Sequence, residues 1–327
     1  MIRDSTAPLE PPDLAQLLSP QFFDSPLPSL TFGLLALYLA GVIRLAATGH
    51  RWSAGRTVVF VLGCAITILA TGSGVERYGT EMVSVFMFQQ LTLMMLVPPL
   101  LVLGSPGTLL LRAIPHRGPG RIVLRFALTL LRSRGAAWLL HPAVTVPLFL
   151  LAFYGLYLAK LADPILRLPN GHVALEFAFL TSGLLFSAPI LSSDPLPVRL
   201  SYPARVIDMT AGIALHAFFG VFLMTSPTVF LEPFAGPTAA LGLDPGRDQE
   251  LAGGLAWSYG EGPNALLLVY ILHRWFRDDT AKARAADRRA DEFGDPDLDS
   301  YNEYLRSLRS ARDRPNDPQS PIRKESP

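Results

Sequence analysis

Charged residues are scarce in this 327-residue chain: Asp, Glu, Lys and Arg make up 17% of it, whereas soluble domains carry about 25%. Hydrophobic residues make up 50%, and the mean hydropathy is +0.33. The formal net charge is only +1, and no basic stripe interleaved with aromatic residues occurs, so the sequence excludes a nucleic-acid-binding protein as a class. The shortage of charge predicts a membrane protein.

Cysteine is almost absent as well. The single cysteine, Cys64, lies in an apolar run, which excludes an intrachain disulfide and a cysteine-based zinc site. The chain also has no nucleophile paired with a base, no Gly-rich phosphate loop and no carboxylate pair at a known spacing, so we expect a protein that is not an enzyme. Residues 1–30 are acidic and proline-rich and do not resemble a signal peptide, so we expect the first apolar helix to be retained as a span.

Long apolar runs dominate the rest of the chain. A bilayer's hydrocarbon core of about 30 Å needs roughly 20 helical residues to cross it. Seven stretches satisfy this, and because they do not alternate polar and apolar positions they favour helices over barrel strands. They lie near residues 30–48, 56–74, 82–104, 143–160, 172–192, 205–226 and 253–275. The sequence therefore predicts an all-α polytopic membrane protein, a seven-transmembrane helix bundle.

The positions of Lys and Arg predict the orientation of this bundle, because cytoplasmic loops carry an excess of both residues. With the N-terminus outside and the C-terminus in the cytoplasm, 23 of the 28 Lys and Arg residues fall on the cytoplasmic side and 5 outside. We expect an extracytoplasmic segment at 1–29, a seven-helix domain at 30–276 and a charged cytoplasmic tail at 277–327. The expected location is the plasma membrane.

Breaks in the apolar pattern predict where helices bend and end. The prolines near residue 98 are expected to kink the third span or to turn its end into an interfacial segment. Loop 105–142 is expected to form in part a helix at the cytoplasmic surface. The tail is expected to be helical, with a break near Gly294–Pro296 and disorder over the last dozen residues. No internal repeat occurs, so an inverted-repeat transporter is not indicated.

Ionisable groups inside membrane spans are costly and indicate function. The polar residues that interrupt the predicted spans are His172, Glu176, Asp208, His216, Glu261, Gln89 and Gln90. His172 and Glu176 are four residues apart and therefore share one face of a helix. Asp208 lies near the cytoplasmic end, whereas four of the others gather in the outer half of the bilayer, around a midplane His216. These four are His172, Glu176, Gln90 and Glu261.

Imidazole, carboxylate and thioether groups together suit copper. The candidate metal ligands are His172, His216, Glu176, Glu261, Met87 and Met224. A proton relay would use the same histidines and carboxylates. Structural interpretations stay open beside these: a core histidine can bond a backbone carbonyl, carboxylates can be neutral or paired, and Gln89 and Gln90 can join helices by hydrogen bonds. We expect His216 to face the fifth and seventh spans.

Several blocks of the sequence resemble one family. They read FQQLTLMMLVPPLLVLGSPGTLLLRAIP, HPAVTVPLFLLAFY, NGHVALEFAFLTSGLLFSAPILSSDP and YPARVIDMTAGIALHAFFGVFLM, and they are similar to successive blocks of the CtaG-type cytochrome c oxidase assembly proteins. The segments DQELAGGLAWSYGEGP and DRRADEFGDPDLDSYNEYL are similar to the actinobacterial branch in particular. In that branch the domain is often fused behind a CopD-like copper-resistance domain, and here it is expected to stand alone. The resemblance covers about residues 30–310.

The resemblance implies a seven-span membrane protein that takes part in forming haem–copper oxidases at the copper-loading stage. The residues that match polar positions of the family blocks are His141, His172, His216 and Glu261. The positions at which family histidines are replaced are occupied by Phe86, Gln90, Glu176 and Ala178. Copper in this chain would therefore be held by His172, Glu176, His216 and methionine side chains.

The predicted function is that of a membrane factor for cytochrome c oxidase assembly, which holds or delivers copper at the outer face. Its expected partners are haem–copper oxidase subunits, other copper chaperones and the lipid bilayer. Two alternatives stay open. One is a copper-transporting permease related to copper-resistance proteins, which would move the ion through the His216 region. The other is a metal-free structural chaperone of the oxidase, which the missing histidines favour.

Overall fold

The computed structural model of the chain describes residues 11–21, 25–115, 117–198, 200–294 and 296–312. Over these ranges every regular element is a helix, and the one β-type contact is an isolated antiparallel bridge between Pro20 and Ser73. The predicted all-α class is thereby confirmed. The chain divides into two compact units, Met1–Leu272 and His273–Pro327.

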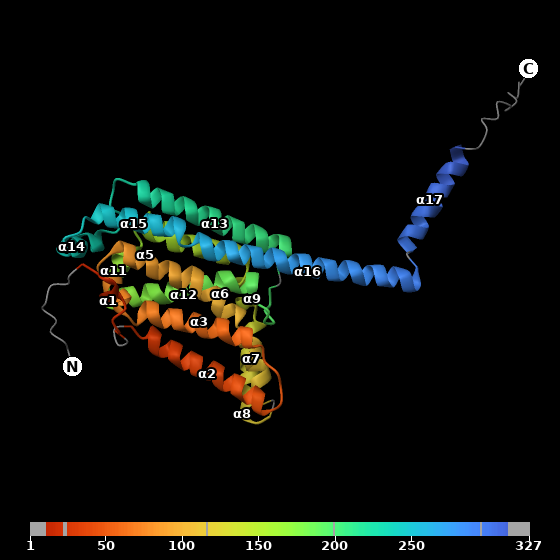
Figure 1. The fold of residues 1–327 in the computed structure, drawn as a ribbon, viewed down its shortest axis with the longest axis horizontal. Helices are drawn as coiled ribbons and strands as arrows, with labels where there is room; N and C mark the ends of the chain where they lie inside the picture. Colours follow the sequence, from red (N-terminus) through yellow and green to blue (C-terminus); the bar gives the residue numbers. More distant parts are fainter. Residues whose placement is uncertain (1–10, 22–24, 116, 199, 295, 313–327) are drawn as a thin grey trace, which may run out of the picture. The chain divides into compact units, whose positions relative to one another are not determined.

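Five helices of the first unit are long and apolar enough to cross a membrane. Four of them are α2 (Leu27–Ala47), α3 (Ala54–Thr71), α12 (Gly171–Leu191) and α13 (Tyr202–Thr225). The fifth covers Val83–Ala113 and consists of α5 (Val83–Leu91), η1 (Thr92–Leu96), α6 (Val97–Leu103) and α7 (Pro106–Ala113). Most of these helices lie side by side in Figure 1. They match five of the seven predicted spans, while the count of seven and the orientation stay predictions.

The other two predicted spans have irregular forms. The fourth is α10 (Pro142–Leu150) continued by the π-helical turn η2 (Leu151–Gly155), which together make a shorter apolar helix. The seventh is interrupted: α15 (Pro245–Ser258) ends before Tyr259, and α16 (Glu261–Phe293) begins after Gly260. The prediction of one continuous helix over 253–275 was wrong. Pro263 has no backbone N–H to donate to the Tyr259 carbonyl, and the glycines at 260 and 262 are poor helix formers, so the helix is interrupted there.

Both π-helical turns lie close to prolines. Pro98 and Pro99 have no backbone N–H to donate, so the carbonyls four residues earlier, inside η1, lose their α-helical partners. The third predicted span is therefore irregular where its prolines indicated. Pro147 lies inside α10, just ahead of η2. π-Helical turns are rare, and they occur frequently at functional sites.

Backbone contacts fix α15 against its neighbours. A Cβ added at Gly220 of α13 would lie 2.5 Å from the backbone nitrogen of Trp257 on α15, so only glycine permits this approach. The Asp248 carboxylate of α15 accepts hydrogen bonds from the Val83 N–H, at 2.6 Å, and from the Ser84 hydroxyl. Asp248 thereby satisfies amides at the start of α5 that have no partner within their own helix.

Short helices connect the long ones in the first unit. They are α1 (Leu14–Leu17), α4 (Gly74–Gly79), α8 (Pro119–Leu131), α9 (Arg134–Leu139), α11 (Ala162–Leu166) and α14 (Glu232–Ala240). The helices α7, α8 and α9 fall in loop 105–142, which confirms that this loop is partly helical. Four large apolar side chains of α8 are exposed, those of Ile122, Val123, Phe126 and Leu130.

The second unit contains the remainder of α16 and α17 (Pro296–Arg312). Gly294, with φ at +77°, follows the end of α16 and supplies the left-handed conformation that glycine adopts readily. The break predicted near Gly294–Pro296 is confirmed. The predictions for the last dozen residues and for the first ten fall outside the described residues.

Candidate functional site

Three ionisable side chains meet where α3 ends and α12 begins. Glu76 comes from α4, and His172 and Glu176 come from the first turns of α12. One potential ligand atom of each lies within 4.8 Å of the other two, and all three residues are buried. Among the residues that the structure describes, no other group of three His, Cys, Asp or Glu side chains is spaced to hold a metal ion. We name this group the Glu–His–Glu cluster.

Local sequence explains how these side chains reach one another. Ser73 caps α4 through its hydroxyl and so fixes the short helix that carries Glu76. Asn170 adopts a left-handed conformation, with φ at 61°, directly before α12 and turns the chain into that helix. The spacing of four residues then places His172 and Glu176 on one helix face, which brings the two together as the sequence predicts.

Gln89 of α5 orients two members of the cluster. Its Nε2 donates to Glu76 Oε2, at 2.8 Å, and to the Ala70 carbonyl, at 3.0 Å. Its Oε1 lies 3.1 Å from His172 Nε2 and acts as an acceptor, so this nitrogen carries the imidazole proton. The same nitrogen lies 3.8 Å from Glu76 Oε1. The second ring nitrogen, Nδ1, is buried and has no hydrogen-bond partner.

Glu176 brings a second carboxylate into this buried space. Its Oε2 accepts a hydrogen bond from the Ser25 hydroxyl at 2.8 Å, whereas its Oε1 is buried without a partner. Two carboxylates so close together in a buried site cannot both remain ionised without a compensating charge. A proton or a cation held between them would supply such a charge, and the chemistry of the cluster suits either one.

His216 is buried but lies apart from the cluster. It is 0% exposed on α13, its ring centroid lies 5.3 Å from that of Phe153, and neither of its nitrogens has a hydrogen-bond partner. A Cβ added at Gly260 would lie 2.5 Å from its Cε1, so His216 packs against the break between α15 and α16. The interpretation of His216 as a core histidine bonded to a carbonyl is therefore wrong, and the structure joins it by hydrogen bonds to neither His172 nor Glu176.

The remaining predicted ligands also lie outside the cluster. Met87 is fully buried, with its sulfur 3.9 Å from a tyrosine hydroxyl. Met224 lies near the end of α13, and Glu261 is the first residue of α16. Gln90 donates to the Ala152 carbonyl at 2.8 Å and so joins two helices, which agrees with its structural interpretation.

The residues that stand where the family has histidines do not all lie near the cluster. The Phe86 ring centroid lies 5.6 Å from that of His172, so an apolar ring borders the cluster there. Glu176 is itself a member. Ala178 is exposed, so its side chain does not face the buried interior.

Glu76 is not among the site residues that the sequence predicted. The residue falls in a short predicted connection between two spans, where one glutamate beside an arginine has the appearance of ordinary surface charge. The shortness of that connection is the signal that could have identified it, because it holds Glu76 close to the start of the next span and to Gln89. Ser25 was missed because it precedes the first predicted span.

These features define a class: a helical membrane protein with a buried histidine–carboxylate cluster where two of its long helices meet. The chain belongs to the cytochrome c oxidase caa3 assembly factor family (Caa3_CtaG), whose sequence model matches residues 36–278. This match covers most of the chain and confirms the family resemblance of its motif blocks.

The chain is similar in sequence to three mycobacterial proteins over almost its whole length. It is 38% identical over 307 residues to uncharacterized proteins of Mycobacterium bovis and Mycobacterium tuberculosis, and 35% identical to one of Mycobacterium leprae. These matches cover 93% of this chain but only 46–47% of the relatives, so the chain spans about half of their length. No solved structure matches the chain at a significant level.

Proposed function

We propose that this protein serves the assembly of cytochrome c oxidase by holding copper, as cargo, in the Glu–His–Glu cluster and delivering it at the outer face of the plasma membrane. Membership of an oxidase assembly factor family supports the oxidase as the partner. The distribution of Lys and Arg supports an outer position, because it places the start of α12 outside. Oxidase subunits and other copper chaperones are the partners that such a role requires.

The residues present fit a cation. An imidazole and two carboxylates form a nitrogen and oxygen donor set that copper(II) accepts. A cation would neutralise the second carboxylate and satisfy Glu176 Oε1, which has no other partner. Binding of a cation at His172 Nε2 would require the imidazole proton, which this nitrogen donates to Gln89, to move to Nδ1. The observation that carries the proposal is the convergence of Glu76, His172 and Glu176 in one buried space.

Metal titration of the purified full-length protein in detergent tests this role. Cu(II) should bind the wild type in the cluster, and Glu76→Gln and Glu176→Gln should each weaken this binding by more than about 10-fold. Gln89→Leu should weaken it by about 10- to 100-fold, as removal of a hydrogen-bond partner behind a metal ligand typically does. Glu261→Gln is the matched control, because Glu261 is a carboxylate outside the cluster and should not affect the affinity.

The same variants should then be expressed in cells that lack the native gene. Loss of oxidase copper and oxidase activity with Glu176→Gln, but not with Glu261→Gln, would agree with copper delivery. Equal Cu(II) affinity in both variants would contradict the cluster as the copper site. Normal oxidase activity together with altered total cellular copper would favour the permease instead. Normal oxidase activity with no metal bound would favour the structural chaperone.

A further inference from the structure

His216 is a buried imidazole that has no hydrogen-bond partner among the residues that the structure describes. It is 0% exposed, and both ring nitrogens lack hydrogen bonds. Its aromatic neighbour Phe153 offers no hydrogen-bond donor or acceptor. Leaving a polar group buried and unsatisfied in an apolar interior is costly, so the arrangement requires an explanation other than packing.

Three irregular stretches of helix converge on this imidazole. Phe153 belongs to η2, Met95 belongs to η1, and Gly260 lies in the break between α15 and α16. The position that a Cβ on Gly260 would occupy lies 2.5 Å from His216 Cε1, 2.9 Å from its Nε2 and 3.0 Å from Met95 Cε. Irregular backbone within membrane helices is tolerated where it is buried in protein or lines a site.

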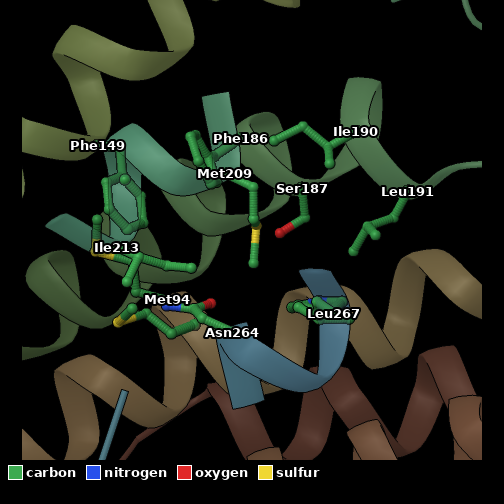
Figure 2. Close-up of a pocket in the computed structure, with 13 residues that line it drawn as sticks. Met94, Phe149, Phe186, Ser187, Ile190, Leu191, Met209, Ile213, Asn264 and Leu267 are labelled. Carbon is green, nitrogen blue, oxygen red and sulfur yellow. The ribbon is translucent and has the colours of Figure 1, made fainter. Parts of the chain in front are cut away.

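Three thioether groups line one cavity in the first unit. An internal cavity of about 10 Å³, which is room for one small ion or one water molecule, is lined by Met94, Met95 and Met209 together with apolar side chains, Ser187 and Asn264. Figure 2 shows Met94, Met209, Ser187 and Asn264 arranged around this space. All three methionines are buried. Three of the seven methionines of the chain therefore line one cavity. His216 does not line it, but Met95 connects the two, because the position of a Cβ on Gly260 lies within 3.0 Å of atoms of both Met95 and His216.

We propose that His216 and Met95, with Met94 and Met209 of the adjoining cavity, form a second metal site that binds copper(I). Thioether and imidazole ligands select this soft monovalent ion, whereas hard cations favour carboxylate ligands, and no carboxylate lines this cavity among the described residues. The Glu–His–Glu cluster instead favours harder cations, because two of its three potential ligands are carboxylates. The proposal deepens the proposed copper function but uses none of the residues of the cluster.

Competition between the protein and the copper(I) chelator bicinchoninate tests this site. The full-length protein in detergent is titrated with Cu(I) under anaerobic reducing conditions, and Ag(I) serves as a redox-inert second probe. Met95→Leu and Met209→Leu should each weaken Cu(I) and Ag(I) binding by at least about 10-fold, and His216→Asn should weaken it further. Leucine conserves the volume of methionine, so these variants are expected to fold. Size-exclusion profiles and helical circular dichroism confirm folding.

Matched controls separate this site from the cluster. Met87→Leu and Met224→Leu remove thioethers outside the cavity and should leave Cu(I) affinity unchanged. Glu176→Gln should weaken Cu(II) but not Cu(I) binding, so failure of the proposed function and failure of this inference give different results. X-ray absorption of the Cu(I) form should show sulfur and nitrogen neighbours. Wild-type Cu(I) affinity in the Met95→Leu, Met209→Leu double variant would overturn the proposal, as would copper surrounded by oxygen alone.

Discussion

The replacement Gly260→Ala tests the packing of the break between α15 and α16. The added methyl carbon would lie 2.5 Å from His216 Cε1 and 3.0 Å from Met95 Cε. Carbon atoms are in optimal contact at about 3.5–4.0 Å, so the imidazole has to move by roughly 1 Å or the break has to open. Adding a methyl group to a packed interior costs about 1–3 kcal/mol. Alanine restricts the unfolded chain and offsets this by about 0.4–1 kcal/mol. We therefore expect a net loss of about 1–2 kcal/mol.

The assay compares Gly260→Ala with Gly262→Ala by unfolding in mixed micelles. Gly262 lies two residues further along, and a Cβ there would meet no atom within 4 Å. Gly262→Ala should therefore leave the free energy of unfolding unchanged or raise it by up to about 1 kcal/mol. If both variants unfold at the same denaturant concentration, the close contact between His216 and Gly260 does not exist and the reasoning is refuted.

Three further predictions concern other parts of the molecule. Asp248→Ala leaves the Val83 amide buried without its acceptor and should lower the free energy of unfolding by about 1–3 kcal/mol; a loss no larger than that of the exposed helix cap variant Asp244→Ala would contradict this. A reporter active only outside the cell should work when fused near residue 240 and fail when fused after residue 280, and the reverse result would invert the proposed orientation. Cu(II) affinity of the cluster should fall as the pH is lowered from about 7 to about 5, because protons compete for its imidazole and carboxylates. A dissociation constant that stays flat over this range would exclude these ligands.

Hydropathy predicted the long regular helices well. The apolar runs of α2, α3, α12 and α13 are continuous, and burial in lipid requires every backbone group in them to pair within the helix. The irregular stretches were harder to predict. The prolines of the third span indicated a distortion but not a π-helical turn. The interruption of the seventh span coincides with Gly260, Gly262 and Pro263, which are helix breakers that a hydropathy average does not register. The contact between Gly260 and His216 at this break depends on tertiary packing, so the local sequence does not predict it.

The candidate site was predicted only in part, for a similar reason. His172 and Glu176 lie four residues apart, so one helix suffices to bring them together. Glu76 and Ser25 reach them from segments far away in the sequence, and their polar side chains lie in stretches that resemble surface loops. His216 was predicted to be buried and is buried, but depth along a helix does not specify which neighbours a side chain faces. That information comes from the rotation of α13 against α15, which close glycine contacts determine.

The hydrogen bond from the start of α5 to Asp248 has a consequence for biosynthesis. Its two partners are 165 residues apart in the chain. At a synthesis rate of about 5–20 residues per second, roughly 8–33 s pass between the appearance of Val83 and that of Asp248. During this interval the first amides of α5 have to find other acceptors, in water, lipid headgroups or the insertion machinery. The polar end of the third span is therefore completed only when α15 arrives, so a ribosome that stalls before residue 248 leaves a membrane-inserted but unfinished protein.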